Sequence, residues 1–329
     1  MKKGLFVGLI LVLISGIISL VACQPDRKQL RRVTVNQAFE HLLYISLYVA
    51  KDAGFFERQG LDVNIETGGG DAQAFSALSS GSAQFAQGDP AFVAIAGEQG
   101  WDGRVITMAV DRVAIWGVTF DKSIEPFNDP IGFKGKTVTT YPEPNTSYVV
   151  QKQLDQKAGL TDKDVKILQV PFGSELATLQ NKQANIAQTI EPNVSQVELQ
   201  GGIVAFSYAD AYGPLAFTGV MTSKKLIDEQ PDLVQKFVNA YEQALQYIQT
   251  DFEGTLNIAQ KRLNNIDPEV IRRALRRLID SNSIPKHAKV DPESWRKLLQ
   301  IRVDVGDLKQ MPTNDLIENA FAEKSLLNK

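Results

Sequence analysis

Few side chains in this 329-residue sequence could act as a thiol nucleophile or supply a thiolate or imidazole to a transition metal. Cys23 is the only cysteine, and His41 and His287 are the only histidines. This set excludes an internal disulfide and falls short of the ligands of a usual zinc site. We therefore expect no catalytic residue, no metal site and no cofactor, and the chemistry to look for is noncovalent binding.

The residues suited to binding lie in loops that follow predicted strands. Ligands of open α/β sheets bind beyond the carboxyl ends of the strands, where helix N-termini also offer free N–H groups. Aromatic and polar side chains gather in these loops. The candidate ligand-binding residues are Phe39, His41, Gly69, Asp89, Tyr141, Asn145, Thr146, Phe172, Glu191, Tyr208, Asp210 and Tyr212.

Several candidates also have a purely structural alternative, and Glu191 could merely lie near the hinge. Tyr208 and Tyr212 could pack the interface between two lobes, and the other aromatic candidates could pack loops. Asp89 could only cap a helix, and His41 could be a satisfied polar residue at a helix start. Asp210 could make a hydrogen bond at a hinge. Asp71 is expected to cap the helix predicted at 72–79.

Strand and helix patterns alternate along the chain, which predicts helices covering mainly parallel sheets. The pattern restarts after residue 116, so we expect two lobes, with 33–115 and 214–329 in lobe 1 and 116–213 in lobe 2. Strands are predicted at 33–36, 61–65, 83–86, 105–110, 135–140, 165–170, 184–190 and 202–206. Amphipathic helices are predicted at 231–250 and from Asp267 and Asp291 onward.

The start of the sequence has the pattern of an export signal. Two lysines precede an apolar run at 4–22, which ends in Leu20-Val21-Ala22-Cys23. This ending resembles the bacterial lipobox, which implies a lipoprotein signal peptide at 1–22, lipidation of Cys23 and a tether at 23–32. The alternative is an uncleaved transmembrane anchor, since the run is about long enough to span a bilayer. Both alternatives place the rest of the chain outside the cytoplasm.

Charge gives no indication of a nucleic-acid partner, because the formal net charge is −3. One helix, beginning near Asp267, carries four arginines. We expect them to form a solvated helix face, with an anion or membrane patch as the alternative. These arginines are Arg272, Arg273, Arg276 and Arg277.

Several segments resemble a family of transport proteins. Residues 47–57 (LYVAKDAGFFE), 60–63 (GLDV) and 68–70 (GGG) are similar to the opening of the nitrate/sulfonate/taurine and thiamine-precursor binding proteins of ABC importers. Residues 133–138 (FKGKTV) resemble that family's entry into its second lobe, and 229–234 (EQPDLV) its return helix. The resemblance covers nearly all of the mature chain in the same order.

The resemblance implies a two-lobed periplasmic-binding-protein fold of type II, with two crossover segments and extra C-terminal helices. The crossovers would lie near 111–118 and 208–219. The protein would be a lipid-anchored monomer that closes on a small molecule and delivers it to an ABC permease. Alternatives of another class are a thiamine-pyrimidine synthesis-type enzyme, whose Cys-rich segment is missing here, and a ligand-presenting sensor subunit.

The predicted loops are rich in acids and poor in arginine. This balance disfavours a simple anion, which binds best to arginine, lysine or helix N-termini. It favours a flat, nitrogen-rich heterocycle, such as a thiamine pyrimidine precursor, or an amine. The alternative is a sulfonate, nitrate or taurine-like anion. The acids are Glu40, Asp89, Glu143, Glu191 and Asp210, and the one arginine is Arg112.

Overall fold

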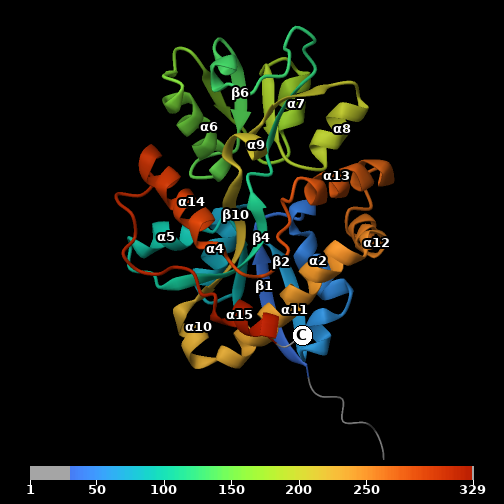
Figure 1. Ribbon diagram of the computed structural model, residues 1–329, viewed down its shortest axis with the longest axis vertical. Coiled ribbons are helices and arrows are strands. Elements are labelled where there is room, and N and C mark those ends of the chain that lie inside the picture. The colour runs from blue at the N-terminus through green and yellow to red at the C-terminus, as the bar shows by residue number, and fades with distance from the viewer. Residues whose placement is uncertain (1–29, 328–329) are drawn as a thin grey trace, which may run out of the picture.

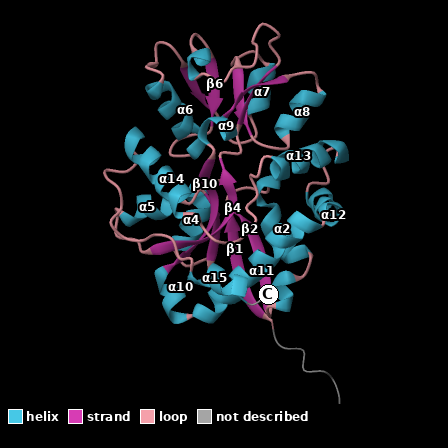
Figure 2. Cartoon of the chain, viewed as in Figure 1, coloured by secondary structure: helices cyan, strands magenta, loops and turns pink. Residues whose placement is uncertain are grey.

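The computed structural model describes residues 30–327, which form two α/β lobes, one above the other in Figure 1. Each lobe is built on a sheet of five strands with helices on both faces, as Figure 2 shows. The predicted fold class is thereby confirmed. The predicted signal peptide, Cys23 and nearly all of the predicted tether lie outside the described residues.

The first sheet, in the lower lobe of Figure 1, has the strand order β2-β1-β3-β10-β4. Four strands run in one direction, and β10 lies antiparallel between β3 and β4. The register of β1 and β2 places Arg31 opposite Leu61 and Gln37 opposite Thr67. The strands are β1 (Arg31–Gln37), β2 (Leu61–Thr67), β3 (Phe85–Gly88), β4 (Gly103–Arg112) and β10 (Pro214–Ser223).

The second sheet repeats this plan with the order β7-β6-β8-β5-β9. Here the antiparallel strand is β5, the first strand of this lobe in the sequence. In the first lobe it is β10, the last strand of that lobe. The register of β6 and β7 places Thr137 opposite Lys166. The strands are β5 (Trp116–Thr119), β6 (Thr137–Thr140), β7 (Lys166–Gln169), β8 (Ile186–Thr189) and β9 (Ile203–Ser207).

Most helices that precede β10 contact strands of the sheet in their own lobe. In the first lobe they are η2 (Leu42–Tyr44), α2 (Ile45–Asp52), α3 (Phe55–Arg58), α4 (Asp71–Ser79) and α5 (Ala91–Gly97). In the second lobe they are η3 (Pro130–Phe133), α6 (Thr146–Lys157), α7 (Glu175–Gln180), α8 (Asn193–Leu199) and α9 (Tyr208–Tyr212).

The C-terminal helices extend the first lobe and reach the second. The long α11 buries the predicted apolar stripe, which includes Leu233, Phe237 and Ile248. Helix α13 contacts α8, and α14 packs against β10 on one side and α6 on the other. The helices are α10 (Lys224–Glu229), α11 (Pro231–Thr250), α12 (Phe252–Arg262), α13 (Pro268–Asp280), α14 (Pro292–Val305) and α15 (Ala320–Leu327).

The chain passes between the lobes twice. It leaves β4 at Arg112 and enters β5 at Trp116, and it returns from α9 into β10 at Pro214. Much of the two predicted crossover ranges is therefore regular structure, and only short segments connect the lobes. Strands β5 and β10 were not among the predicted elements, because their patterns fall within or next to the predicted crossovers.

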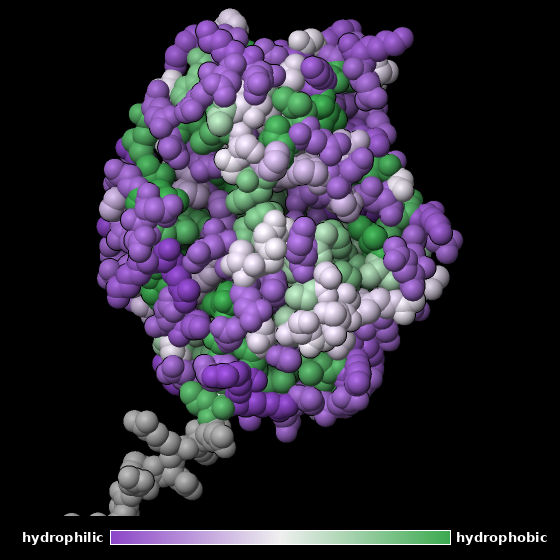
Figure 3. Space-filling model, turned by 180° about the vertical axis from the view of Figure 1, so that it is seen from behind, coloured by the Kyte–Doolittle hydropathy of each residue, from purple (hydrophilic) through white to green (hydrophobic). Residues whose placement is uncertain are grey.

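The surface seen from behind in Figure 3 is mostly hydrophilic, with hydrophobic residues in small separate groups. Such a distribution is usual for a surface in contact with water. Among the helices of residues 30–327, none combines the length and apolar character that crossing a bilayer requires.

Candidate functional site

A cavity lies between the two lobes, and most of its lining follows the carboxyl end of a strand. It has about 460 Å³ of space between atoms, its open side included. The enclosed cavity volume is about 50 Å³, room for a few waters. The lining residues are Phe39, His41, Leu43, Tyr44, Asp71, Asp89, Ile115, Tyr141, Asn145, Thr146, Phe172, Ile190, Phe217 and Thr218.

The structure brings seven of the twelve candidate residues to this cavity. They come from loops after β1 and β3 in the first lobe and after β6 and β7 in the second, although these segments are far apart in the sequence. The seven residues are Phe39, His41, Asp89, Tyr141, Asn145, Thr146 and Phe172. Whether they bind a solute remains a prediction.

Tyr208 and Tyr212 do not line the cavity. Tyr208 is buried, its ring packs against Phe206, and its hydroxyl donates to Gln151 on α6. The Tyr212 hydroxyl donates to the carbonyl oxygen of Val150, 2.8 Å away. Both side chains therefore pack against α6 within the second lobe, a structural role but not the interface packing that was the alternative to ligand binding.

The other three candidates also lie apart from the cavity lining. Glu191 is fully buried, accepts hydrogen bonds from the Ser195 amide and hydroxyl, and forms an ion pair with Arg277 at 2.6 Å. Asp210 is exposed on α9. Gly69 has a positive φ of 88°, which favours glycine, and its N–H donates to the carbonyl of the residue after β1.

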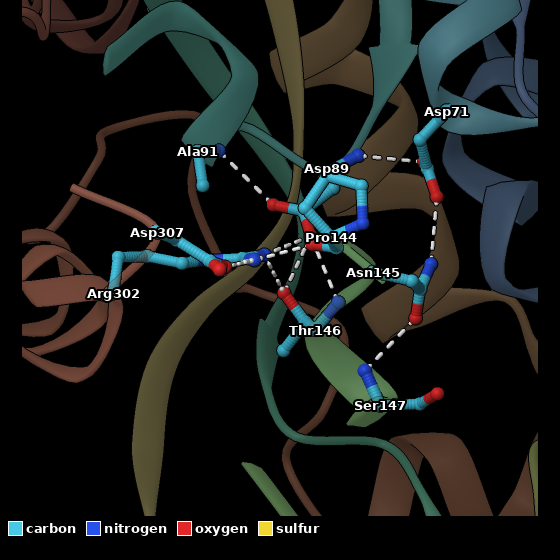
Figure 4. Close-up of polar contacts among 9 residues, drawn as sticks. All are labelled: Asp71, Asp89, Ala91, Pro144, Asn145, Thr146, Ser147, Arg302 and Asp307. Carbon is cyan, nitrogen blue, oxygen red and sulfur yellow. Dashed lines mark hydrogen bonds and ion pairs between the residues drawn. The ribbon is translucent and has the colours of Figure 1, made fainter. Parts of the chain in front are cut away.

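Asp71 is the main site residue that the sequence analysis misjudged. It was expected to cap α4, but that helix has no side-chain cap hydrogen bond. Its Oδ1 instead accepts from the Asp89 N–H at 2.9 Å, and its Oδ2 accepts from Asn145 Nδ2 at 2.8 Å. The second of these bonds joins the two lobes, as Figure 4 shows.

Arg302 connects Asp89 to the second lobe in the same view. Its Nη2 lies 2.5 Å from Asp89 Oδ2 and donates to Thr146 Oγ1 at 2.7 Å. The Thr146 hydroxyl donates to the same carboxylate at 2.5 Å, and the Thr146 N–H does so at 3.2 Å. Arg302 Nη1 binds Asp307 at 2.7 Å and the carbonyl of Pro144. The arginine side chain is 0% exposed, so water does not screen these contacts.

The sequence does contain a signal for Arg302. It lies seven residues after Trp295, four after Leu298 and three after Leu299, so it falls on the buried stripe of α14. A charged residue in that position needs buried partners. The identity of those partners could not be read from the sequence, because Asp89 and Thr146 are distant along the chain.

Aromatic rings fill the gap between the lobes beside this network. Phe39 and Phe172 stack across the gap with 3.9 Å between ring centroids and an interplanar angle of 18°. Tyr141 lies 5.1 Å from Phe172, and the ring of His41 meets Phe172 edge-on at 5.5 Å. This arrangement gives the cavity flat apolar walls, which favour planar solutes.

Burial controls the protonation of the polar side chains in the lining. Desolvation lowers the pKa of His41 to about 3, so its imidazole is neutral. Its Nδ1 accepts from the Leu43 N–H, which leaves Nε2 to carry the proton. Burial also raises the pKa of Tyr141 well above its usual value, and its hydroxyl donates to Glu175.

The charge at the cavity differs in detail from the sequence expectation. Asp71 and Asp89 line it, whereas Glu40, Glu143 and Asp210 are exposed elsewhere and Glu191 is paired with Arg277. Among residues 30–327, no lysine or arginine side chain lines the cavity, and Arg302 contacts the lining through Asp89 and Thr146. The cavity therefore does combine acids with aromatics, but of the two acids only Asp89 was predicted, and Asp71 was not.

Solved structures with the same fold include several transport proteins. The nitrate-binding protein NrtA of Synechocystis aligns with a TM-score of 0.72 at 15% identity, covering 91% of this chain and 89% of that one. The aliphatic sulphonate binding protein SsuA of Escherichia coli aligns with a TM-score of 0.68 at 15% identity, covering 86% and 89%. The desulfurization enzyme DSZB also aligns, with a TM-score of 0.65 at 11% identity, covering 91% and 99%. These identities show a shared fold, and the fold alone does not separate binding from catalysis.

Sequence comparison finds a related chain and a matching family. A Bacillus subtilis chain named as a binding protein, YtlA, is 25% identical over 312 residues, which are 93% of each chain. The family model described as "NMT1/THI5 like" matches residues 43–253, well over half of the chain. The expected family is thereby confirmed, and the chain belongs to the NMT1/THI5-like family.

Proposed function

We propose that this chain is the solute-binding component of an ABC importer and that its solute is a small, planar, nitrogen-containing molecule. The lobes would be 33–115 with 214–329, and 116–213. One observation supports this choice of solute: the donors that could bind an anion already donate to the carboxylate of Asp89. Its carboxylate accepts from the N-terminal N–H of α6 at Thr146 and from Arg302.

An anionic solute would need those same donors. Helix N-termini and arginines are the usual partners of sulfonate, nitrate and carboxylate groups. At this cavity both are already bound to a protein carboxylate, and Asp71 adds a second negative charge beside it. A planar heterocycle with N–H donors suits the remaining surface, which consists of aromatic rings and carboxylate oxygens.

Two-lobe closure supplies the mechanism. A solute that binds one lobe gains contacts with the other only when the gap closes, and this difference in affinity shifts the open–closed equilibrium. In this structure the lobes are already in contact, through the Asp71–Asn145 hydrogen bond and the Phe39–Phe172 stack. A solute that inserts between these rings would replace their contact with its own. The closed form would then dock on the permease.

The proposal includes a lipid anchor on Cys23 that holds the protein outside the cytoplasm. The described chain begins at the lower end of the first lobe in Figure 1, far from the cavity. An anchor on that side would leave the gap between the lobes open to solutes. Cys23→Ser should release the protein from membranes in cell fractionation, whereas equal membrane retention of both forms would contradict the anchor.

An enzyme of the same fold is the second candidate, since DSZB is one. Within the part of the chain that the structure describes, the cavity lining offers no cysteine, serine or lysine nucleophile. His41 is held neutral and hydrogen-bonded to the backbone. These observations favour binding over catalysis.

Calorimetry and small-angle scattering test the proposal together. The purified chain would be titrated with an aminopyrimidine, an alkylamine, taurine and nitrate. We expect the aminopyrimidine or the amine to bind and to change the radius of gyration. Tyr141→Ala should weaken that binding, and Tyr208→Phe, which alters a residue away from the cavity, should not. Tight binding of taurine or nitrate would overturn the choice of solute, and no response to any solute would overturn the function.

A further inference from the structure

The two carboxylates at the cavity have different partners. Asp89 forms an ion pair with Arg302 at 2.5 Å. Asp71 accepts only neutral hydrogen bonds, from the Asp89 amide and the Asn145 side chain. Within residues 30–327 no lysine, arginine or histidine forms an ion pair with Asp71. Asp71 is therefore the carboxylate that lacks a counter-ion.

The nearest cation is already shared. The single positive charge of Arg302 faces two carboxylates, Asp89 at 2.5 Å and Asp307 at 2.7 Å. With Asp71, the group holds three carboxylates and one guanidinium. Burial and the neighbouring Asp89 charge raise the pKa of Asp71 to about 6, which reflects the cost of an ionised carboxylate there. A positive charge placed beside Asp71 would remove that cost.

The surroundings of Asp71 also suit a cation. A carboxylate can accept about four hydrogen bonds, and only two to Asp71 are supplied by the protein. The faces of nearby rings attract positive charge as well as planar groups. The aromatic lining residues are Phe39, Tyr44, Tyr141, Phe172 and Phe217.

We propose that Asp71 selects the charge of the solute, and that the solute carries a planar, positively charged N–H donor group such as an amidinium or aminopyridinium. This inference rests on the proposed function, because it requires a solute to enter this cavity. Asp71 would bind the N–H groups while the aromatic rings cover the faces of the solute.

Three probes of equal shape and different charge test the inference. Benzamidinium is a cation, benzamide is neutral and benzoate is an anion, and all three carry the same ring. The full chain would be titrated with each at up to millimolar concentration by calorimetry. We expect benzamidinium to bind at least about tenfold more tightly than benzamide, with benzoate weakest.

Asp71→Asn should lower the benzamidinium affinity by about tenfold or more and leave benzamide nearly unchanged. Asp111→Asn is the matched control, because Asp111 is also partly buried in the first lobe with a raised pKa but does not line the cavity. It should alter none of the three affinities. Unchanged benzamide binding would show that Asp71→Asn still folds.

Three results would overturn the inference. Benzoate could bind more tightly than benzamidinium, Asp71→Asn could leave the ratio of benzamidinium to benzamide unchanged, or none of the probes could bind. If an aminopyrimidine or another solute still closes the lobes in these cases, the proposed function survives and only the role of Asp71 fails.

Discussion

Two arginines from C-terminal helices join the lobes, Arg302 of α14 and Arg277 of α13. The two helices lie on opposite sides of the molecule in Figure 1. On the α14 side, Arg302 binds Asp89 and Thr146 and is 0% exposed. On the α13 side, Arg277 binds Glu191 at 2.6 Å and Glu198 at 2.5 Å, and its side chain is 28% exposed. The chemistry is the same, but access to water differs. The comparison indicates that burial, rather than the number of ion pairs, decides how strongly each side holds the lobes together.

The largest effect should come from Arg302→Met. This change leaves the carboxylates of Asp89 and Asp307 without their cation in a site that excludes water. Removing one partner of a buried pair costs about 3–5 kcal/mol. We expect a fall in Tm of roughly 10 °C by calorimetry.

Arg302→Lys provides the control for this prediction. Lysine keeps the charge but lacks the planar fork that reaches Asp89, Thr146 and Asp307 together, so an intermediate Tm is expected. If Arg302→Met lowered Tm no more than an exposed substitution does, the buried contacts of Arg302 would stabilise the protein no more than the partly exposed contacts of Arg277.

Arg277→Met should destabilise less, by about 1–2 kcal/mol. Glu191 is fully buried but keeps its hydrogen bonds from the Ser195 amide and hydroxyl when Arg277 is lost. Since Arg277 is partly exposed, salt should screen its bridge to Glu198 but hardly affect Arg302. Urea unfolding at low and high salt measures this, with Glu198→Gln as the exposed control. An equal salt dependence on both sides would contradict the comparison.

Arg302 and Arg277 also differ in how far their burial and partners could be predicted from the sequence. Arg302 interrupts an apolar stripe, which signals a buried charge. Arg277 was expected on a solvated face among four arginines, and its bridge to Glu191 was not foreseen. The boundaries of α11 and the starts of α13 and α14 followed from local spacing and proline at the first turn, and the structure confirms them.

What could not be predicted depends on contacts between distant segments. Asp71 had the position of a helix cap, and only its closeness to Asn145, 74 residues later, makes it a cavity residue. Tyr208 and Tyr212 had the composition of ligand-stacking residues, but the fold turns their hydroxyls toward α6. Strand β10 carries a long apolar segment that a local pattern does not assign to a sheet when its partner strands are far away.

A smaller effect is expected at Asn145, which bridges the lobes without a charge. Its Oδ1 caps α6 by accepting from the Ser147 N–H, and its Nδ2 donates to Asp71. Asn145→Ala should cost about 1 kcal/mol through the lost cap. Asn145→Asp keeps the cap but sets a second carboxylate against Asp71, so it should separate the lobes, as scattering would show. If both variants gave the same radius of gyration, the Asp71–Asn145 contact would not hold the lobes closed.

The smallest expected effect is a change of stability with pH. It should come from buried carboxylates that form no ion pair with an arginine, in contrast to Asp89 and Glu191, which do. Asp155 in the second lobe accepts from Gln151 Nε2 at 2.9 Å but has no ion pair within residues 30–327, and burial raises its pKa to about 6. The folded state therefore binds this proton more tightly than the unfolded state, whose pKa is near the usual value. The free energy of unfolding should rise by about 1 kcal/mol for this group as the pH falls from 7 to 5. This contribution is lost again as the pH rises through 6. Asp71 and Asp111, with pKa values also about 6, act in the same direction.

Urea midpoints for the natural chain and Asp155→Asn, measured against pH, give the share of Asp155. Asparagine cannot titrate, so the curve of the variant should be flatter. Parallel curves would mean that Asp155 is ionised at no cost and that a buried carboxylate in this fold does not need a cation.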